Sequence, residues 1–469
     1  MRKIVFILFF CSSKLVGQGQ IEPIYESLPN DAIDSLSISV HSSILPRLTS
    51  FQKTNSFSLK GLIDVANKFN ESYHNRLGAG FIVNGFLAKK WHLNVGTVFS
   101  ATNSIEQLHP NSFLESKVNN TPVFSDIRGR LSYSPNSLFN FQIGLDHNFI
   151  GEGCRSLFLS DYGKPYPFGQ LRVKFWRLEY LVLYQFFREK NINNEWFQKN
   201  AATHYLSFNA TKWLNIGLFE TVLFQPKDTL LNRGYELEYL NPVIFYRPQE
   251  YALGSSDNVI MGLSFSAKRK KLMIYGQVLI DEFVFKELTE NRGWWGNKYG
   301  FQLGLKGRFS FGKGNYIYRI ELNSVRPYTY AHIGSGQNYG NQGFALAHPY
   351  GANFKELLGE LKFQRDKFLI KAFVNYSLRG LDSSALINYG SNIYSSYSNR
   401  PFDYGNTIGQ GMRLEQLKSV FHFSYLVHKK TNLQFFIEQQ LTYIIKPSLF
   451  QYSILIGIRS QLWNDYRNY

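Results

Sequence analysis

Two stretches of the sequence gather the residue types from which binding or catalytic sites are built. The first spans 144–172 and reads GLDHNFIGEGCRSLFLSDYGKPYPFGQLR. Glycines permit a tight backbone turn, and an arginine, a serine and an aspartate offer a positive donor, a hydroxyl and an acceptor. The residues concerned are Gly151, Gly153, Arg155, Ser156 and Asp161. They predict either an inward-folded loop held by an Arg-to-Asp contact or a ligand-contacting surface. We favour the loop, because its glycine and proline spacing needs no ligand to explain it.

The second stretch spans 238–262 and reads EYLNPVIFYRPQEYALGSSDNVIMG. Asn241-Pro242 and Arg247-Pro248 interrupt the strand pattern here, and Tyr246, Tyr251 and Asp257 offer stacking and hydrogen-bonding groups. The main residues are Asn241, Pro242, Tyr246 and Arg247. Stacking combined with bidentate bonding is a common way to hold a sugar, but the same groups also rigidify a loop.

No recognised catalytic motif accompanies these stretches. The sequence contains no GxSxG elbow, no HExxH motif, no paired-cysteine metal spacing and no glycine loop that would cradle a phosphate. Glu220 and the pair Asp281 and Glu282 are the carboxylates best placed to act as an acid or base, but solvated carboxylates paired with arginines are the preferred interpretation. We therefore expect a protein that is not an enzyme and has no cofactor or metal site.

The elements that must position these residues are strands with one apolar and one polar face. Alternation with period 2 places successive side chains on opposite faces of a strand. It is clearest where Phe301, Leu303 and Leu305 alternate with Gln302, Gly304 and Lys306. The same pattern predicts strands over 139–146, 299–309, 316–323, 421–428 and 452–461. A soluble β-sandwich also alternates, so the number and length of the strands must decide between the two folds.

Length and composition favour a membrane barrel. Beyond the first twenty residues, the 469-residue chain has no apolar run of the roughly 18 residues that a spanning helix needs. It also has no linker that would divide it into domains. An aromatic content of 17% fits a lipid-facing wall with interfacial girdles. We predict an all-β fold, a transmembrane outer-membrane β-barrel of about 18 antiparallel strands.

The N-terminal region is expected to contain a targeting segment. Residues 1–19 have a positive start, an apolar run and small or polar residues, which is typical of a secretory signal peptide. Cys11 raises the question of a lipoprotein site, but Phe10 fits that site poorly. Residues 20–75 are interpreted as a periplasmic plug or the barrel's first strand, with a short helix around Leu62–Phe69. The barrel is placed at 76–469.

Connections between the strands fall into two classes. Short charged turns are predicted at 268–271, 311–315, 364–367 and 428–432, and long Tyr-, Asn- and Gly-rich loops at 281–298, 324–358 and 379–417. Barrels of this type carry short turns on the periplasmic rim and long loops outside. Two alternatives stay open for the lumen: an open interior, or one plugged by an inward-folded loop or a short helix.

The formal net charge of +17 bears on the partner. A protein exported to the outer membrane rarely meets nucleic acid, so acidic surface polysaccharide and the phosphates of lipopolysaccharide are the expected partners. The alternative is that lysines and arginines simply mark strand ends at the lipid headgroups.

The two stretches described first also carry a resemblance. GEGCRSLFLSDYGKPYPF, YLNPVIFYRPQEYALGSSDN and the run of strands after about residue 75 resemble the Wzi-like capsule assembly family, in its Bacteroidetes branch that includes the gliding-motility protein RemB. The resemblance implies an outer-membrane barrel, lectin-like in the capsule branch and linked to surface gliding in some relatives. It transfers no ligand site residue by residue.

The leading hypothesis is a non-enzymatic, lectin-like barrel in the cell outer membrane that takes part in capsule or exopolysaccharide assembly or attachment. The polysaccharide is expected to contact the long loop 324–358 at Arg326, Tyr328, Tyr330, His332 and Tyr339. The alternative is a gliding-motility or secretion accessory protein that binds a surface adhesin. A passive pore is a third class.

Overall fold

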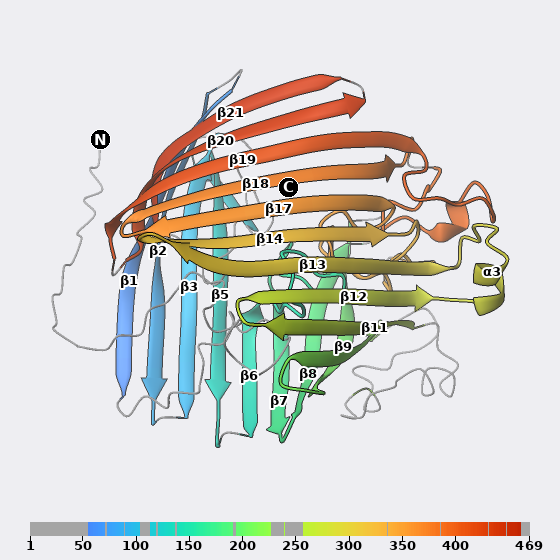
Figure 1. Cartoon of the computed structure of the whole chain (residues 1–469), viewed down its shortest axis with the longest axis horizontal. Coiled ribbons are helices and arrows are strands. Elements are labelled where there is room, and N and C mark those ends of the chain that lie inside the picture. Colours follow the sequence, from blue (N-terminus) through green and yellow to red (C-terminus); the bar gives the residue numbers. More distant parts are fainter. Residues whose placement is uncertain are drawn as a thin grey trace.

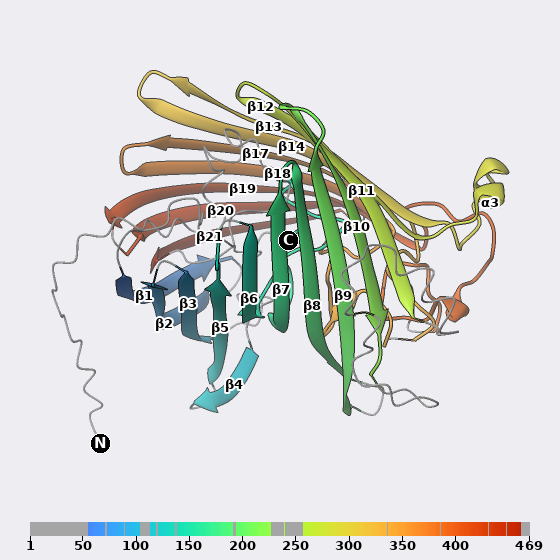
Figure 2. The same ribbon diagram turned by 90° about the horizontal axis from the view of Figure 1, so that it is seen from below.

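The protein is a closed antiparallel β-barrel (Figures 1 and 2). The structure, a computed structural model, describes residues 55–70, 73–88, 90–103, 113–118, 121–136, 138–190, 194–226, 239, 257–334, 336–384, 386–429, 431–446 and 448–460. The predicted signal peptide, Cys11, and Asn241, Pro242, Tyr246 and Arg247 lie outside these residues. Among the described residues, no helix combines the length and apolar character that a membrane crossing would need.

The described strands belong to a 19-stranded sheet and a small two-stranded one. The large sheet consists of β1 (Ser56–Phe69), β2 (Tyr73–Leu87), β3 (Trp91–Thr102), β4 (Phe113–Val118), β5 (Thr121–Tyr133), β6 (Phe139–Asp146), β7 (Tyr166–Phe175), β8 (Leu178–Lys190), β9 (Trp196–Asn209), β10 (Leu214–Phe224), β11 (Asn258–Arg269), β12 (Leu272–Glu282), β13 (Lys298–Phe311), β14 (Gly314–Val325), β17 (Phe354–Arg365), β18 (Phe368–Leu381), β19 (Met412–His428), β20 (Leu433–Lys446) and β21 (Leu449–Ser460). The small sheet pairs β15 (Gly340–Asn341) with β16 (Phe344–Ala345), and the helical turns are α3 (Phe285–Thr289) and η4 (Tyr397–Asn399).

Eighteen strands of the large sheet form the ring, which β1 and β21 close. β1 pairs with β2 along its whole length, and its second half, Asp64–Phe69, pairs with Ile454–Arg459 of β21. Within the ring, β3 pairs directly with β5. The short strand β4 also pairs with β5, but it projects from the wall (Figure 2). The predicted fold and the strand number of about 18 are confirmed, and the five predicted strands correspond to β6, β13, β14, β19 and β21.

The wall is apolar outside and polar inside. In β13, Leu303 is 51% exposed on the outer face, while the adjacent Gln302 is 3% exposed and points into the lumen. Lys306 is buried on the same inner face. A soluble protein would bury the leucine and expose the glutamine, so this arrangement is the one that a bilayer requires.

The predicted short turns and the predicted long loops lie at opposite rims. The predicted turns at 268–271, 311–315, 364–367 and 428–432 all connect strands at one rim. The connections 283–297, 326–353 and 382–411 all lie at the other rim, where α3 marks the long-loop end in Figure 1. The predicted asymmetry is therefore confirmed.

One sequence prediction for the N-terminal region is wrong. The segment Leu62–Phe69 is the second half of strand β1, not a short helix. Ile63, Val65 and Phe69 lie on one face and Asp64 and Lys68 on the other, and its backbone bonds to β2 and β21. The described wall thus begins at Ser56, earlier than the predicted boundary at residue 76.

Two long loops fill part of the lumen instead of projecting outward. We define the lumen plug as the β6–β7 loop, 147–165, and the β14–β17 loop, 326–353. Leu157 and Phe158 of the first loop and Tyr330 and Leu346 of the second are fully or almost fully buried in one apolar cluster with the wall. The two loops also bond to each other, since Ser160 N donates to Leu346 O at 2.8 Å. The lumen is therefore plugged by inward-folded loops. The short helix α3 is not part of the plug, because none of its residues is buried.

The apolar outer face of the wall predicts how a charged substitution affects stability at different positions along β13. Leu303→Arg should lower the free energy of unfolding by about 2–4 kcal/mol, because the charge would lie near the bilayer midplane. Phe311→Arg, at the short-turn rim, should cost about 0–1 kcal/mol. Urea unfolding in lipid vesicles measures both values. Equal costs at the two positions would contradict the assigned membrane depth.

Candidate functional site

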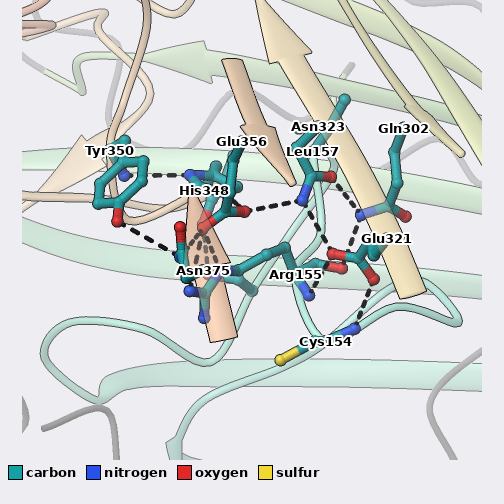
Figure 3. A network of polar contacts seen from close by, with 12 residues as sticks. Cys154, Arg155, Leu157, Gln302, Glu321, Asn323, His348, Tyr350, Glu356 and Asn375 are labelled. Carbon is teal, nitrogen blue, oxygen red and sulfur yellow. Dashed lines mark hydrogen bonds and ion pairs between the residues drawn. The ribbon is translucent and has the colours of Figure 1, made fainter. Parts of the chain in front are cut away.

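Glu321 on β14 holds the backbone of the β6–β7 loop (Figure 3). Its Oε2 accepts hydrogen bonds from the Cys154 amide at 2.8 Å and from the Tyr275 hydroxyl at 2.7 Å. Its Oε1 accepts from the Arg155 amide at 3.1 Å. A carboxylate that accepts adjacent backbone amides fixes the loop's direction, so Glu321 anchors the plug to the wall.

Glycine is required where this loop meets the wall. A Cβ at Gly153 would lie 2.4 Å from Glu321 Oε2, and Gly151 has a φ of +153°, in the region that favours glycine. The close approach and the backbone conformation explain the two glycines singled out from the sequence, without any ligand.

Glu356 on β17 is the second anchor. Its Oε1 lies 3.2 Å from Arg155 Nη2 and accepts from Asn375 Nδ2 at 2.6 Å. Its Oε2 accepts from Asn323 Nδ2 at 2.9 Å and from His348 Nε2 at 2.8 Å. Figure 3 shows these side chains converging on the carboxylate from the wall and from both plug loops.

His348 is a neutral donor in this network. Its Nδ1 accepts a hydrogen bond from the Tyr350 amide at 3.1 Å, so the ring proton resides on Nε2, which faces Glu356. Burial lowers the pKa of His348, and the nearby Glu356 carboxylate offsets only part of that effect. The positive charge that balances Glu356 is therefore that of Arg155.

Two glutamines of the wall complete the attachment of the plug. Gln277 accepts from the Leu157 amide at 2.8 Å and donates to Ile150 O at 3.1 Å. Gln302 donates to Arg155 O at 3.0 Å. The polar residues that alternate along β12 and β13 thus hold the inward loop.

The candidate residues of the first stretch belong to this plug. Arg155 and Ser156 are buried, and Ser156 Oγ donates to Ile150 O at 2.5 Å. Asp161 is buried as well. The inward-folded loop is therefore observed, with the carboxylates of Glu321 and Glu356 holding it from the wall. Asp281 accepts from the Tyr330 amide at 2.7 Å and Glu282 pairs with Lys298 at 3.0 Å, which gives this carboxylate pair a structural role.

Three of the five residues predicted to contact polysaccharide are buried in the plug. Tyr328, Tyr330 and Tyr339 have no exposed surface, and the Tyr330 hydroxyl donates to Leu157 O at 2.8 Å. The expected outward orientation is wrong for these tyrosines, because the loop that carries them folds into the lumen. Arg326 and His332 are only partly buried. Arg326 Nη2 donates to Trp294 O at 3.2 Å, so it supports the neighbouring loop.

Among the described residues, an exposed part of the long-loop rim comes from two other loops, 283–297 and 382–411. Backbone hydrogen bonds join them: Trp295 N donates to Asp403 O at 2.9 Å, and Gly405 N donates to Arg292 O at 2.8 Å. Asn406 N also donates to Gly293 O at 2.9 Å. Because these backbone hydrogen bonds run between the two loops, the loops form one continuous surface.

Aromatic rings and arginines cover this surface, which we call the loop-end surface. It comprises Arg292, Trp294, Trp295, Tyr397, Arg400, Phe402 and Tyr404. The Arg400 guanidinium lies 4.1 Å from the Trp295 ring centroid, and that of Arg292 lies 4.5 Å from the Tyr404 ring. Sequence reasoning missed these residues, although the adjacent tryptophans in a predicted outer loop were a usable signal.

No arrangement for metal chemistry was found in the described part of the chain, since it contains no group of three or more His, Cys, Asp or Glu side chains that could hold a metal ion. The buried carboxylates Glu321 and Glu356 accept hydrogen bonds from donors of both the plug and the wall. Their arrangement serves attachment, not acid–base exchange with solvent.

Comparison with known proteins places the fold. No family model and no curated protein matches the sequence. Among solved structures, the chain is similar to Wzi, described as an outer membrane protein involved in group 1 capsule assembly in Escherichia coli and as a carbohydrate-binding β-barrel. The TM-score is 0.56 at 13% identity, covering 86% of this chain and 85% of that one. At this identity the likeness is one of fold alone, a Wzi-like outer-membrane barrel.

Weaker likenesses extend to other outer-membrane proteins. OprD from Pseudomonas aeruginosa gives a TM-score of 0.47 at 10% identity, covering 86% of this chain and 93% of that chain. OccAB1 from Acinetobacter baumannii gives 0.45 at 10% identity, covering 88% of this chain and 97% of that one. Scores this low carry no argument about function.

The Arg155–Glu356 ion pair is expected to contribute to the local stability of the plug. Glu356→Gln should cost the plug's local stability about 3–5 kcal/mol, because it leaves the Arg155 charge buried without its partner. Hydrogen exchange of the amides in 150–160 measures this effect. The double variant Arg155→Met, Glu356→Gln should recover part of the protection.

The control for this prediction is Asp366→Asn at the short-turn rim, where an exposed pair with Arg365 at 3.7 Å contributes little. Protection of 150–160 that is the same in the wild type and in Glu356→Gln would mean that the pair does not hold the plug.

Proposed function

We propose that the protein is a non-enzymatic outer-membrane barrel that binds acidic surface polysaccharide at its long-loop end. Its role would be in capsule or exopolysaccharide assembly or attachment. The observation that carries the proposal is the loop-end surface, where an ordered set of aromatic rings and arginines lies at the rim that faces outward in barrels of this type.

The chemistry of the loop-end surface suits sugars. Phe402 and Tyr404 are 41% and 43% exposed, so ring faces are available for stacking against the apolar face of a sugar. Arg292 has exposed ion pairs with Glu287 and Glu290, at 3.2 and 2.5 Å. Exposed pairs are weak, so a uronate carboxylate or a phosphate can exchange for them.

Charge and membrane contact support the same partner. The net charge of +17 attracts an acidic polymer over a distance that salt screens. The apolar outer face of the wall suits outer-membrane lipid, and basic residues at the rims suit the phosphates of lipopolysaccharide. The fold likeness to a carbohydrate-binding barrel is in keeping with this proposal.

The lumen plug makes a passive pore a weaker proposal. The β6–β7 and β14–β17 loops are buried inside the ring and bonded to its wall through Glu321 and Glu356. A gliding-motility or secretion accessory role, with a surface adhesin as partner, would use the same exposed loops, and polysaccharide binding distinguishes it from the leading proposal.

The test is binding of the detergent-purified protein to the host's own surface polysaccharide, titrated against salt. Saturable binding that weakens as salt rises is expected. The double variant Phe402→Ala, Tyr404→Ala should bind at least about tenfold more weakly, which corresponds to about 1.4 kcal/mol.

The matched control is Phe311→Ala, an exposed phenylalanine at the opposite rim, which should bind as the wild type does. Alanine at Tyr328 or Tyr330 should lower stability instead of acting on binding alone, because these rings pack in the plug. Absence of saturable binding at low salt would contradict the proposal and favour the adhesin-binding role.

A further inference from the structure

Most of the buried cations inside the barrel are matched with carboxylates. Arg130 lies 2.6 Å from Asp146, Lys306 lies 2.8 Å from Glu152, and Arg172 lies 3.2 Å from Glu179. Arg155 has its pair with Glu356. This matching is expected, because an uncompensated charge in a partly dry interior is costly.

Arg379 on β18 and Lys418 on β19 are partly exposed cations of the lumen and have no such match in the part of the chain that the structure describes. Among the described residues, no carboxylate lies within ion-pair distance of either side chain. Arg379 places its guanidinium 4.4 Å from the centroid of the Tyr350 ring in the plug. A ring face attracts a cation but does not neutralise it.

Both side chains face the lumen from neighbouring strands. Lys418 pairs across the sheet with Asn375, which lies four positions before Arg379 on β18 and donates to Glu356. Val374, next to Asn375, and Leu417, next to Lys418, are exposed on the outer, apolar face, and Arg379 lies on the same face of β18 as Asn375. Strand alternation therefore directs Arg379 and Lys418 toward the plug.

The Glu356 carboxylate acts on Arg379 from beyond ion-pair distance. The charged groups with the largest effect on Lys418 are cations, namely Arg379, Arg155 of the plug and Lys68 of β1. Of these, Arg155 is balanced by Glu356. The elements packed around Lys418 thus add to its positive potential, and this potential would be lowered by an anion.

Solvent reaches both cations. Arg379 and Lys418 each keep part of their surface exposed, whereas Arg155 and Lys306 are buried. Each cation therefore keeps surface that is available to a small anion.

We propose that Arg379 and Lys418 form an internal oxyanion site between the plug and the β18–β19 wall. Its ligand is a carboxylate or phosphate group, carried by an acidic sugar or present as a free ion. The guanidinium offers two parallel donors to such a group, and the ammonium offers a third from the neighbouring strand. The site is separate from the loop-end surface and does not rest on it.

Calorimetric titration of the full chain in lipid nanodiscs tests the site, with sodium glucuronate, inorganic phosphate and glucose as probes. Saturable binding of at least one anion is expected, with none for glucose. Arg379→Met and Lys418→Met should each weaken it at least about tenfold. Binding of glucuronate alone would identify a sugar acid as the ligand, and binding of phosphate would identify a general oxyanion site.

Lys60→Met is the matched control, since Lys60 also faces the lumen but lies nearer the short-turn rim on β1. It should leave anion binding unchanged. The Phe402→Ala, Tyr404→Ala variant should also keep it, so that failure of this site and failure of the loop-end surface are distinguishable.

Two results would overturn the internal site: no saturable binding of either anion to the wild type, or equal binding by the wild type and both methionine variants. If a methionine variant does not fold, the Phe402→Ala, Tyr404→Ala variant decides, because its loop-end surface is already impaired. Its melting temperature must rise with glucuronate or phosphate more than with sodium chloride at equal ionic strength.

Discussion

The closure of the ring by hydrogen bonds between β1 and β21 is the constraint on which the rest of the structure depends. A bilayer offers no partner for an open strand edge, so the sheet must bond to itself, and its side chains must then be apolar outside. Polar side chains are consequently directed inward along every strand. The lumen of this barrel is lined with carboxylates, amides and cations before any ligand is considered.

The plug uses that polar lining. Glu321, Glu356 and two glutamines of the wall bond mainly to the plug's backbone and to Arg155, so the wall specifies the path of the inward loops. The loops that remain at the rim are joined to each other by backbone bonds. The plug thus fills part of the lumen, and the joined loops form the exposed surface at one end of the barrel. Arg379 and Lys418 lie between the plug and the wall, at a place where no carboxylate of the described residues is paired with them.

The sequence predicted the repeated elements well and the long-range contacts poorly. Alternation around Leu303 identified β13 directly, because strand period is a local property. Leu62–Phe69 was mistaken for a helix because closely spaced apolar residues fit both periods over so short a segment. Tyr328 and Tyr330 were expected at the surface, since no local pattern distinguishes a loop that projects outward from one that folds inward. Nothing near Arg155 indicates Glu356 as its partner.

The separation between those partners constrains the order of assembly. The amide of Cys154 bonds to a carboxylate 167 positions further along the chain, and Arg155 meets its partner 201 positions away. Long-range contacts of this kind form late, because the intervening chain must first be ordered. The β6–β7 loop therefore has no wall to bind until β14 and β17 are in place. The attachment of this loop to the wall thus depends on residues of strands that follow it in the chain by more than 150 positions.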